Sequence, residues 1–292
     1  MLYRPEKFGR IIFLFLGFLA YLLISVSSIS AQNISGVINS YAQVLDLDTC
    51  TNQLLVNDSK GFFAGDRVLL IEMKGAIIDV TNSPNFGTVT DYARAGNYEF
   101  GDVAQVQGLV ITLKDRIVRK YDIGVGSVQI VKVPRYSDPI VIDTLKAKPW
   151  DGFVGGIVVF EASGTVTLTG DINVTGDGFS GGRNSRNGSA TANQTKLFYP
   201  AQSDSAANKG ESIAAVNLSF GAGRGASSNG GGGGDGQNSG GGVSTYIRIH
   251  GIVRNAGTAG TIQLKWAQNV AGGAGNSTIL RQDSYIKATR VN

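Results

Sequence analysis

The sequence is poor in histidine, cysteine, proline and charge, and each shortage excludes a class of protein. A single histidine excludes a metal centre built from several histidines, and a single cysteine excludes an internal disulfide. With 6 prolines and no Gly-X-Y period, the 41 glycines cannot form a collagen helix. Charged residues are 16% of the 292-residue chain, too few for a coiled coil or a charged helical bundle. Glycine must therefore serve turns, close backbone approach or flexible segments, and we predict an all-β architecture.

The first 31 residues resemble a secretory signal peptide. Basic residues precede an apolar run over residues 11–24, and small residues follow it up to Ala31. This run is shorter than the roughly 20 residues that a membrane-spanning helix needs. We therefore predict cleavage after Ala31 and a secreted or bacterial cell-surface location, with an uncleaved membrane anchor as the alternative. Contact with a membrane is expected only through this export signal.

The charge of the chain gives no sign of a nucleic-acid partner. Residues 1–31 hold three basic residues and one Glu, so their removal lowers the formal net charge from +4 to +2. The densest basic run, residues 114–120, is interrupted by Asp115 and followed by Asp122. Nucleic-acid binding needs a cluster of Lys and Arg on one face, which this sequence does not supply. No nucleic-acid partner is expected.

Short apolar runs separated by Gly, Asn and Asp fill residues 32–150. This punctuation predicts strands joined by turns, and the unbroken apolar run 68–71 indicates a strand buried on both faces. We predict a compact β-sandwich or barrel-like domain, with a loop or a short helix at residues 90–96. The candidate strands are Ala42–Leu47, Gln53–Val56, Arg67–Glu72, Leu109–Lys114, Val128–Val133 and Ile140–Leu145.

Beyond residue 150 the pattern changes three times. Residues 151–182 repeat pairs of aliphatic side chains with glycines between them, which predicts short solenoid-like rungs, or two hairpins that close the first domain. Residues 183–242 are glycine-rich and predict a flexible segment, or close-packed extended strands without side chains. Residues 243–292 alternate again and predict a small C-terminal β module.

Few residues stand in a pattern that carries catalysis. The P-loop pattern is absent, and His250 falls within an alternating strand, so no catalytic residue is predicted. Asp151 and Glu161 are the carboxylates that a carbohydrate-active enzyme built on a β-helix would use, although the sequence does not place them in one cleft. The chain is therefore predicted not to be an enzyme.

Trp266, Trp150 and Asp151 are the candidate ligand-binding residues. An indole ring can cover a sugar ring, and a carboxylate accepts hydrogen bonds from sugar hydroxyls. An extracellular glycan or another surface polymer is the expected partner. A tryptophan packed in a core is the alternative for Trp266.

No cofactor is expected, and calcium is the ion that the sequence favours if one is bound. Asp46, Asp48, Asp177 and Asp235 stand in turn-rich segments, where oxygen ligands suit a hard cation. None of them completes a known calcium loop, and Asx turns without a metal are the alternative. A homo-oligomer is also expected, because a short terminal β module buries little apolar area alone.

Three segments, GDRVLLIEMKGA (residues 65–76), VQIVKVPRY (residues 128–136) and the run over 149–182, are similar to the N-terminal region of large secreted surface proteins of gliding bacteria. This resemblance covers about residues 35–240 and implies an adhesin or cell-surface component. Those proteins are usually longer and end in a sorting domain, from which this chain departs. Its last fifty residues resemble instead the small β module that closes some phage tail-fibre proteins.

These observations predict a secreted or cell-surface structural or adhesion protein without catalytic activity. Two alternatives stay open. One is a carbohydrate-active β-helix enzyme that acts on a polysaccharide, and the other is a phage tail-associated receptor-binding protein.

Overall fold

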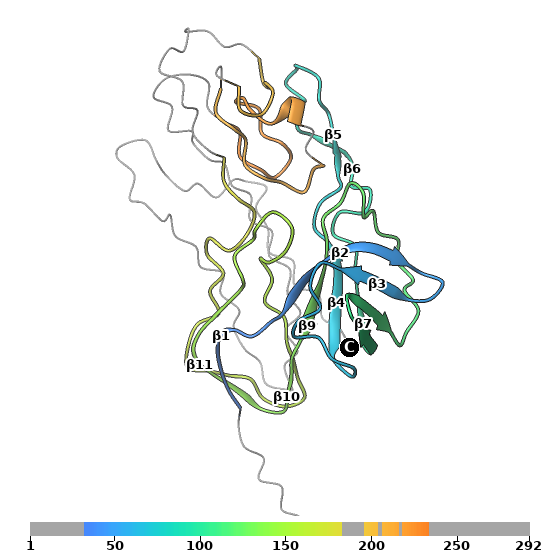
Figure 1. The fold of residues 1–292 in the computed structure, drawn as a ribbon. Helices are drawn as coiled ribbons and strands as arrows, with labels where there is room; N and C mark the ends of the chain where they lie inside the picture. The colour runs from blue at the N-terminus through green and yellow to red at the C-terminus, as the bar shows by residue number, and fades with distance from the viewer. Residues whose placement is uncertain (1–31, 183–195, 204–205, 216–217, 234–292) are drawn as a thin grey trace, which may run out of the picture.

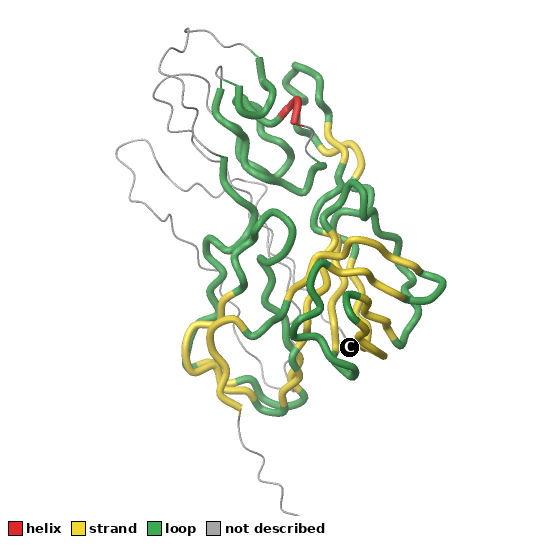
Figure 2. Tube along the Cα trace, viewed as in Figure 1, coloured by secondary structure: helices red, strands yellow, loops and turns green. Residues whose placement is uncertain are grey.

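The computed structural model describes residues 32–182, 196–203, 206–215 and 218–233, and it confirms the all-β prediction (Figures 1 and 2). The one helical element among these residues is a single 3-10 turn, η1 (Leu218–Phe220). No helix in the described part of the chain is long and apolar enough to cross a membrane. The strands are β1 (Gln32–Val37), β2 (Tyr41–Asp48), β3 (Gln53–Val56), β4 (Arg67–Glu72), β5 (Ile77–Ile78), β6 (Val89–Asp91), β7 (Tyr98–Gln107), β8 (Val110–Leu113), β9 (Val128–Val133), β10 (Arg135–Tyr136), β11 (Pro139–Lys146), β12 (Glu161–Ala162) and β13 (Thr167–Leu168).

Six antiparallel strands close into a barrel in the order β2-β3-β8-β7-β4-β9. Alternate side chains point inward along each strand, and Val68 and Leu70 of β4 belong to the main core that these inward side chains form. Leu69, between them, points outward and packs with Ile157, from a segment that covers this side of the barrel. The run 68–71 is therefore largely buried on both faces, as its unbroken apolar composition predicted.

All six strands expected from the sequence are confirmed, and the structure adds a long strand that the pattern did not reveal. β7 pairs with β4 on one side and with β8 on the other. Gly101 occupies one of its inward positions and the register shifts between Val103 and Gln105, so the apolar alternation is interrupted. Residues 90–96 form the end of β6 and a turn, so no helix occurs there.

A second body of parallel strands lies beside the barrel (Figure 1). β11 pairs in parallel with β1 on one side and β13 on the other, and β10 pairs in parallel with β12. This arrangement gives the expected solenoid-like rungs. It begins before residue 151, however, because β1 and β11 already belong to it. The barrel is thus inserted in the chain between two neighbouring rungs, β1 and β11.

The last rung is open to solvent. Ile34, Val141 and Leu168 stand in one row across the three parallel strands, because the register pairs each with the next. The first two are buried, whereas Leu168 is 59% exposed. Ile172, which bridges to the buried Leu145, is 48% exposed. These aliphatic residues therefore occupy core-facing positions for which no covering layer exists among the described residues.

Described parts of the glycine-rich tract pack closely on one another and on the loop before β6. They do so through turns and single bridges, and not as the extended strands of the second sequence-based alternative. Gly210 donates to the carbonyl of Gly231 at 2.8 Å, and Gly233 donates to that of Gly223 at 2.8 Å. Figure 1 shows this part of the tract, in orange, beside β5 and β6. Flexibility of the whole segment 183–242 stays a prediction, and residues 183–195 and 234–242 lie outside the described residues.

Candidate functional site

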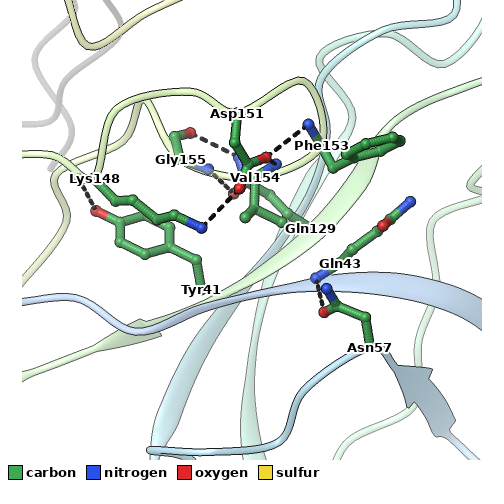
Figure 3. A network of polar contacts seen from close by, with 9 residues as sticks. All are labelled: Tyr41, Gln43, Asn57, Gln129, Lys148, Asp151, Phe153, Val154 and Gly155. Atoms are coloured by element: carbon green, nitrogen blue, oxygen red, sulfur yellow. Dashed lines mark hydrogen bonds and ion pairs between the residues drawn. The ribbon is translucent and has the colours of Figure 1, made fainter.

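A short loop, residues 148–156, crosses the outer face of the barrel and contains two of the candidate ligand residues (Figure 3). Tyr41 of β2 accepts a hydrogen bond from the Lys148 amide at 3.3 Å and donates one to the Ile157 carbonyl at 2.5 Å. Burial raises the pKa of this tyrosine, so its hydroxyl keeps its proton. These contacts fasten both ends of the loop to the barrel.

The middle of the loop is fastened by a buried glutamine of β9. Gln129 donates from Nε2 to the carbonyl of Gly155 at 3.1 Å, and its Oε1 accepts from the Gly155 amide at 2.9 Å. Gly155 has φ +112°, and a Cβ there would lie 2.6 Å from the carbonyl oxygen of Lys148. Glycine is therefore required at this position.

Asp151 uses both carboxylate oxygens to hold the turn. Oδ1 accepts from the amides of Phe153 at 3.0 Å and Val154 at 2.9 Å, and Oδ2 accepts from Lys148 Nζ at 2.8 Å. Burial raises the pKa of Asp151, but these hydrogen bonds outweigh it and hold the pKa below the usual aspartate value. Asp151 is therefore an ionised structural anchor of the loop.

Trp150 points into the protein. It is 6% exposed, its ring meets Phe179 edge-on at 5.2 Å between centroids, and Lys74 Nζ lies 5.2 Å from the ring centre. Lys74 also pairs with Glu211 at 2.6 Å, which ties this cluster to the glycine-rich tract. A ring enclosed in this way offers no open face to a sugar in this conformation. Trp266, the other candidate, lies outside the described residues.

The aromatic side chain that this loop does expose is Phe153, which sequence reasoning missed. It is 55% exposed, while the next residue, Val154, is buried. The sequence contained a weak signal for an exposed ring here, because Phe153 directly follows Asp151-Gly152, a pair typical of turns. Only the fold shows which of the two aromatic rings, Trp150 or Phe153, points outward.

The second carboxylate of the enzyme alternative, Glu161, belongs to a different ion-pair network. Its oxygens lie 3.2 Å from Arg135 Nε and 3.4 Å from Arg67 Nε. Asp102 joins both arginines, at 2.6 Å from Arg135 and 3.5 Å from Arg67. The network links β4 and β7 of the barrel to β10 and β12 of the rungs, whereas Asp151 is paired with Lys148.

One serine pattern was also missed in the sequence. Residues 178–182, GFSGG, fit the G-x-S-x-G pattern of serine hydrolases. In those enzymes the serine stands on a turn between a strand and a helix, whereas here the segment is a loop with no helix after it among the described residues. The Ser180 amide donates to Glu211 at 2.9 Å, which makes it a docking point for the glycine-rich tract.

The calcium candidates do not form one group. Asp48 caps the β2-β3 turn by accepting from the Cys50 amide at 2.8 Å and the Thr51 hydroxyl at 2.7 Å. These bonds, that of Thr51 foremost, lower the pKa of Asp48.

The other calcium candidates are also engaged separately. Asp46 accepts from the next backbone amide along the chain, and the Asp177 carbonyl accepts from the Trp150 amide. Asp235 lies outside the described residues. Among the described residues no three His, Cys, Asp or Glu side chains gather as metal ligands would, and calcium stays a prediction.

A buried carboxyl lies at the end of β4. Glu72 is 0% exposed; its Oε2 accepts from the Asp122 amide at 2.9 Å, and its Oε1 is buried without a hydrogen-bond partner. Cβ atoms at Gly75 and Gly126 would lie 2.7 and 2.3 Å from Oε1, so glycine is what leaves room for the carboxyl. Burial raises the pKa of Glu72, and the hydrogen bond from the Asp122 amide opposes this shift, as Arg94 does to a smaller extent.

This raised pKa makes stability depend on pH. The folded state holds the Glu72 proton more tightly than the unfolded state does. Protonated Glu72 therefore contributes fully to the free energy of unfolding below the ordinary glutamate pKa, and this contribution is lost as pH rises through the raised pKa. Glu72→Gln removes an ionisable group, and we expect it to stabilise the protein by roughly 1–3 kcal/mol above that range. Thermal unfolding measured from pH 4 to 9 checks this. The exposed carboxylate variant Asp115→Asn should keep the wild-type slope; an unchanged slope in Glu72→Gln contradicts the assignment.

Comparison with known proteins finds little. No family profile and no curated protein matches the chain. Two solved structures are weakly similar to part of the chain. The Gp54 tailspike of Acinetobacter baumannii bacteriophage AP22, solved with A. baumannii capsular saccharide, is 15% identical at a TM-score of 0.25 over 49% of this chain. The tailspike gp49 of Pseudomonas phage LKA1 is 13% identical at a TM-score of 0.23 over 51%.

The matched part of this chain spans about a quarter of each tailspike, 27% and 24%. At these TM-scores the likeness carries no argument about function. The last fifty residues, for which the sequence predicted a likeness to a phage tail-fibre module, lie outside the described part of the chain. The resemblance to surface proteins of gliding bacteria has no support among these comparisons.

Proposed function

We propose that this chain is an exported attachment protein that binds an extracellular glycan and does not cleave it. The observation that carries the proposal is the loop 148–156, which is fixed to the barrel by Tyr41, Gln129 and Asp151 and holds Phe153 out to solvent. A loop that is already ordered loses little conformational entropy when it binds a ligand. Such a loop on a barrel is suited to recognition.

The carboxyl groups support binding over hydrolysis. A glycosidase needs one carboxyl with a raised pKa that faces the glycosidic bond. The pKa of Asp151 is lowered, which is the opposite of what a general acid requires. The pKa of Glu72 is raised, but this side chain is fully buried and cannot reach a polymer.

The phage receptor-binding alternative shares the same ligand class and differs in location. The export segment at residues 1–31 favours a bacterial cell surface over a virion. We include a homo-oligomer in the proposal, because Leu168 and Ile172 leave an aliphatic row exposed at the open rung. Light scattering of the purified protein measures its state of association.

The proposal is tested with the chain purified after export. On an array of bacterial polysaccharides we expect saturable binding and no new reducing ends after prolonged incubation. Peptide mapping of the exported product should find Gln32 at its start. Release of oligosaccharides that disappears in Asp151→Asn or Glu161→Gln would overturn the proposal in favour of the enzyme. A product retained in the cytosol would overturn the proposed extracellular location.

A further inference from the structure

Phe153 is held rigidly although its ring is exposed. Its amide donates to Asp151, and the following residues are fixed by the burial of Val154 and the paired hydrogen bonds between Gly155 and Gln129. An exposed aromatic ring on a mobile loop must be ordered before it can bind, whereas here the backbone is ordered beforehand. The exposed ring is therefore available to stack on a ligand without a prior rearrangement of the loop backbone.

Two amide side chains lie on the same outer face of the barrel. Gln43 of β2 is directly opposite Gln129 of β9, and opposite residues of antiparallel strands point to the same face. Gln43 is therefore next to the glutamine that holds the loop (Figure 3). Asn57 joins Gln43 on its other side, with Oδ1 accepting from the Gln43 amide at 2.9 Å.

The side-chain amides of Gln43 and Asn57 have unused hydrogen-bond donors and acceptors. Among the described residues nothing hydrogen-bonds the side-chain amide of Gln43 or Nδ2 of Asn57. Asn57 is nevertheless fixed, because it exchanges two hydrogen bonds with the Gln43 backbone, at 2.9 and 3.0 Å. The loop and this face of the barrel thus offer an exposed aromatic ring, the held amide of Asn57 and the unpaired side-chain amide of Gln43.

Charge narrows the class of ligand. Lys148 and Asp151 are paired at 2.8 Å, so they neutralise each other beside Phe153. A polyanion would need unpaired cations along its path, and an extended protein partner would need a larger apolar area. A neutral sugar fits the set, since its C–H face covers an aromatic ring and its hydroxyls pair with amides.

We infer that Phe153, Gln43 and Asn57 form a shallow site for a neutral saccharide, with Phe153 as the stacking platform. This inference rests on the proposed glycan-binding function. It assigns to Phe153 the role that the sequence suggested for Trp150.

The test compares Phe153→Ala with Phe63→Ala by titration against the neutral polysaccharides that the wild-type protein binds on an array. Phe63 is the matched control, because it is 64% exposed and lies in the loop before β4, outside the 148–156 loop. We expect Phe153→Ala to weaken binding at least about tenfold, which is roughly 1.4 kcal/mol. Phe63→Ala should bind as the wild type does, and Phe153→Tyr should retain affinity because it keeps the ring.

The melting temperature of Phe153→Ala should equal that of the wild type, since the ring is largely exposed. Gln43→Ala should weaken binding to a lesser degree. If Phe153→Ala binds the polysaccharide as tightly as the wild type does, this site is wrong, whereas the proposed function is unaffected. Wild-type binding to charged polysaccharides only would overturn the ligand class, and binding to no glycan would overturn both.

Discussion

Gly233→Ala is expected to detach the glycine-rich tract from its packed position. A Cβ at residue 233 would lie 1.9 Å from the carbonyl oxygen and 2.6 Å from the carbonyl carbon of Ala207. Both are backbone atoms, which cannot move away as a flexible side chain can. The displacement would also break the hydrogen bond from Gly233 to Gly223. We expect a local loss on the order of 3 kcal/mol or more, with the barrel still folded.

Hydrogen exchange of residues 206–233 measures this loss, and the melting transition of the barrel provides the reference. Gly178→Ala is the matched control, because a Cβ there meets nothing within 4 Å and the residue has no positive φ. The control should exchange as the wild type does. Equal protection of residues 206–233 in Gly233→Ala and Gly178→Ala would show that the tract does not pack in this way.

Lys209→Met is expected to loosen the same tract by removing its central ammonium group. Lys209 Nζ donates to the carbonyls of Leu197 at 2.8 Å and Gly223 at 3.1 Å, and to that of Gly225. The ring centre of Phe86, in the loop before β6, lies 4.5 Å away. Burial lowers the pKa of Lys209 to about 8. Methionine would fill the space but remove one donor from each of the three carbonyls. Those of Leu197 and Gly223 keep a backbone donor, from Gly225 and Gly233, whereas that of Gly225 keeps none among the described residues.

We expect the substitution to cost about 1–3 kcal/mol of local stability, since it removes three charge-assisted hydrogen bonds and leaves the Gly225 carbonyl unpaired. Limited proteolysis of the tract and hydrogen exchange at residues 218–233 provide the measurement. Lys196→Met, which changes an exposed lysine of the neighbouring segment, is the control and should have little effect. Equal protease resistance of the two variants would contradict the role assigned to Lys209.

Local periodicity was sufficient to place most of the barrel. The bounds of β3, β4 and β9 agree with the apolar runs that predicted them, because these strands alternate or are buried on both faces. β7 was not predicted because Gly101 occupies an inward position and the register shifts between Val103 and Gln105, which breaks the alternation. The pairing of β1 with β11 was not predicted for another reason. It joins Ile34 to Val141, and no local pattern connects residues so far apart in the sequence.

The candidate site was found in part. Asp151 and Trp150 did mark the loop that stands out on the barrel, but the roles within it are different. Trp150 is enclosed by Phe179 and Lys74, and Asp151 anchors the turn, while Phe153 is the exposed ring. Aromatic residue types are alike in sequence, and exposure depends on which side of the backbone the neighbouring segments cover.

The sequence by itself determined the β architecture, the shortage of metal-binding and disulfide-forming residues, and the positions of strands whose side chains alternate, since these depend on composition and on neighbours along the chain. Only the tertiary structure decided that the barrel is inserted between parallel rungs, that described glycines meet backbone to backbone, and that Phe153 rather than Trp150 faces solvent. The physical reason is that burial and backbone approach are properties of segments distant in sequence, which become neighbours only when the chain has folded.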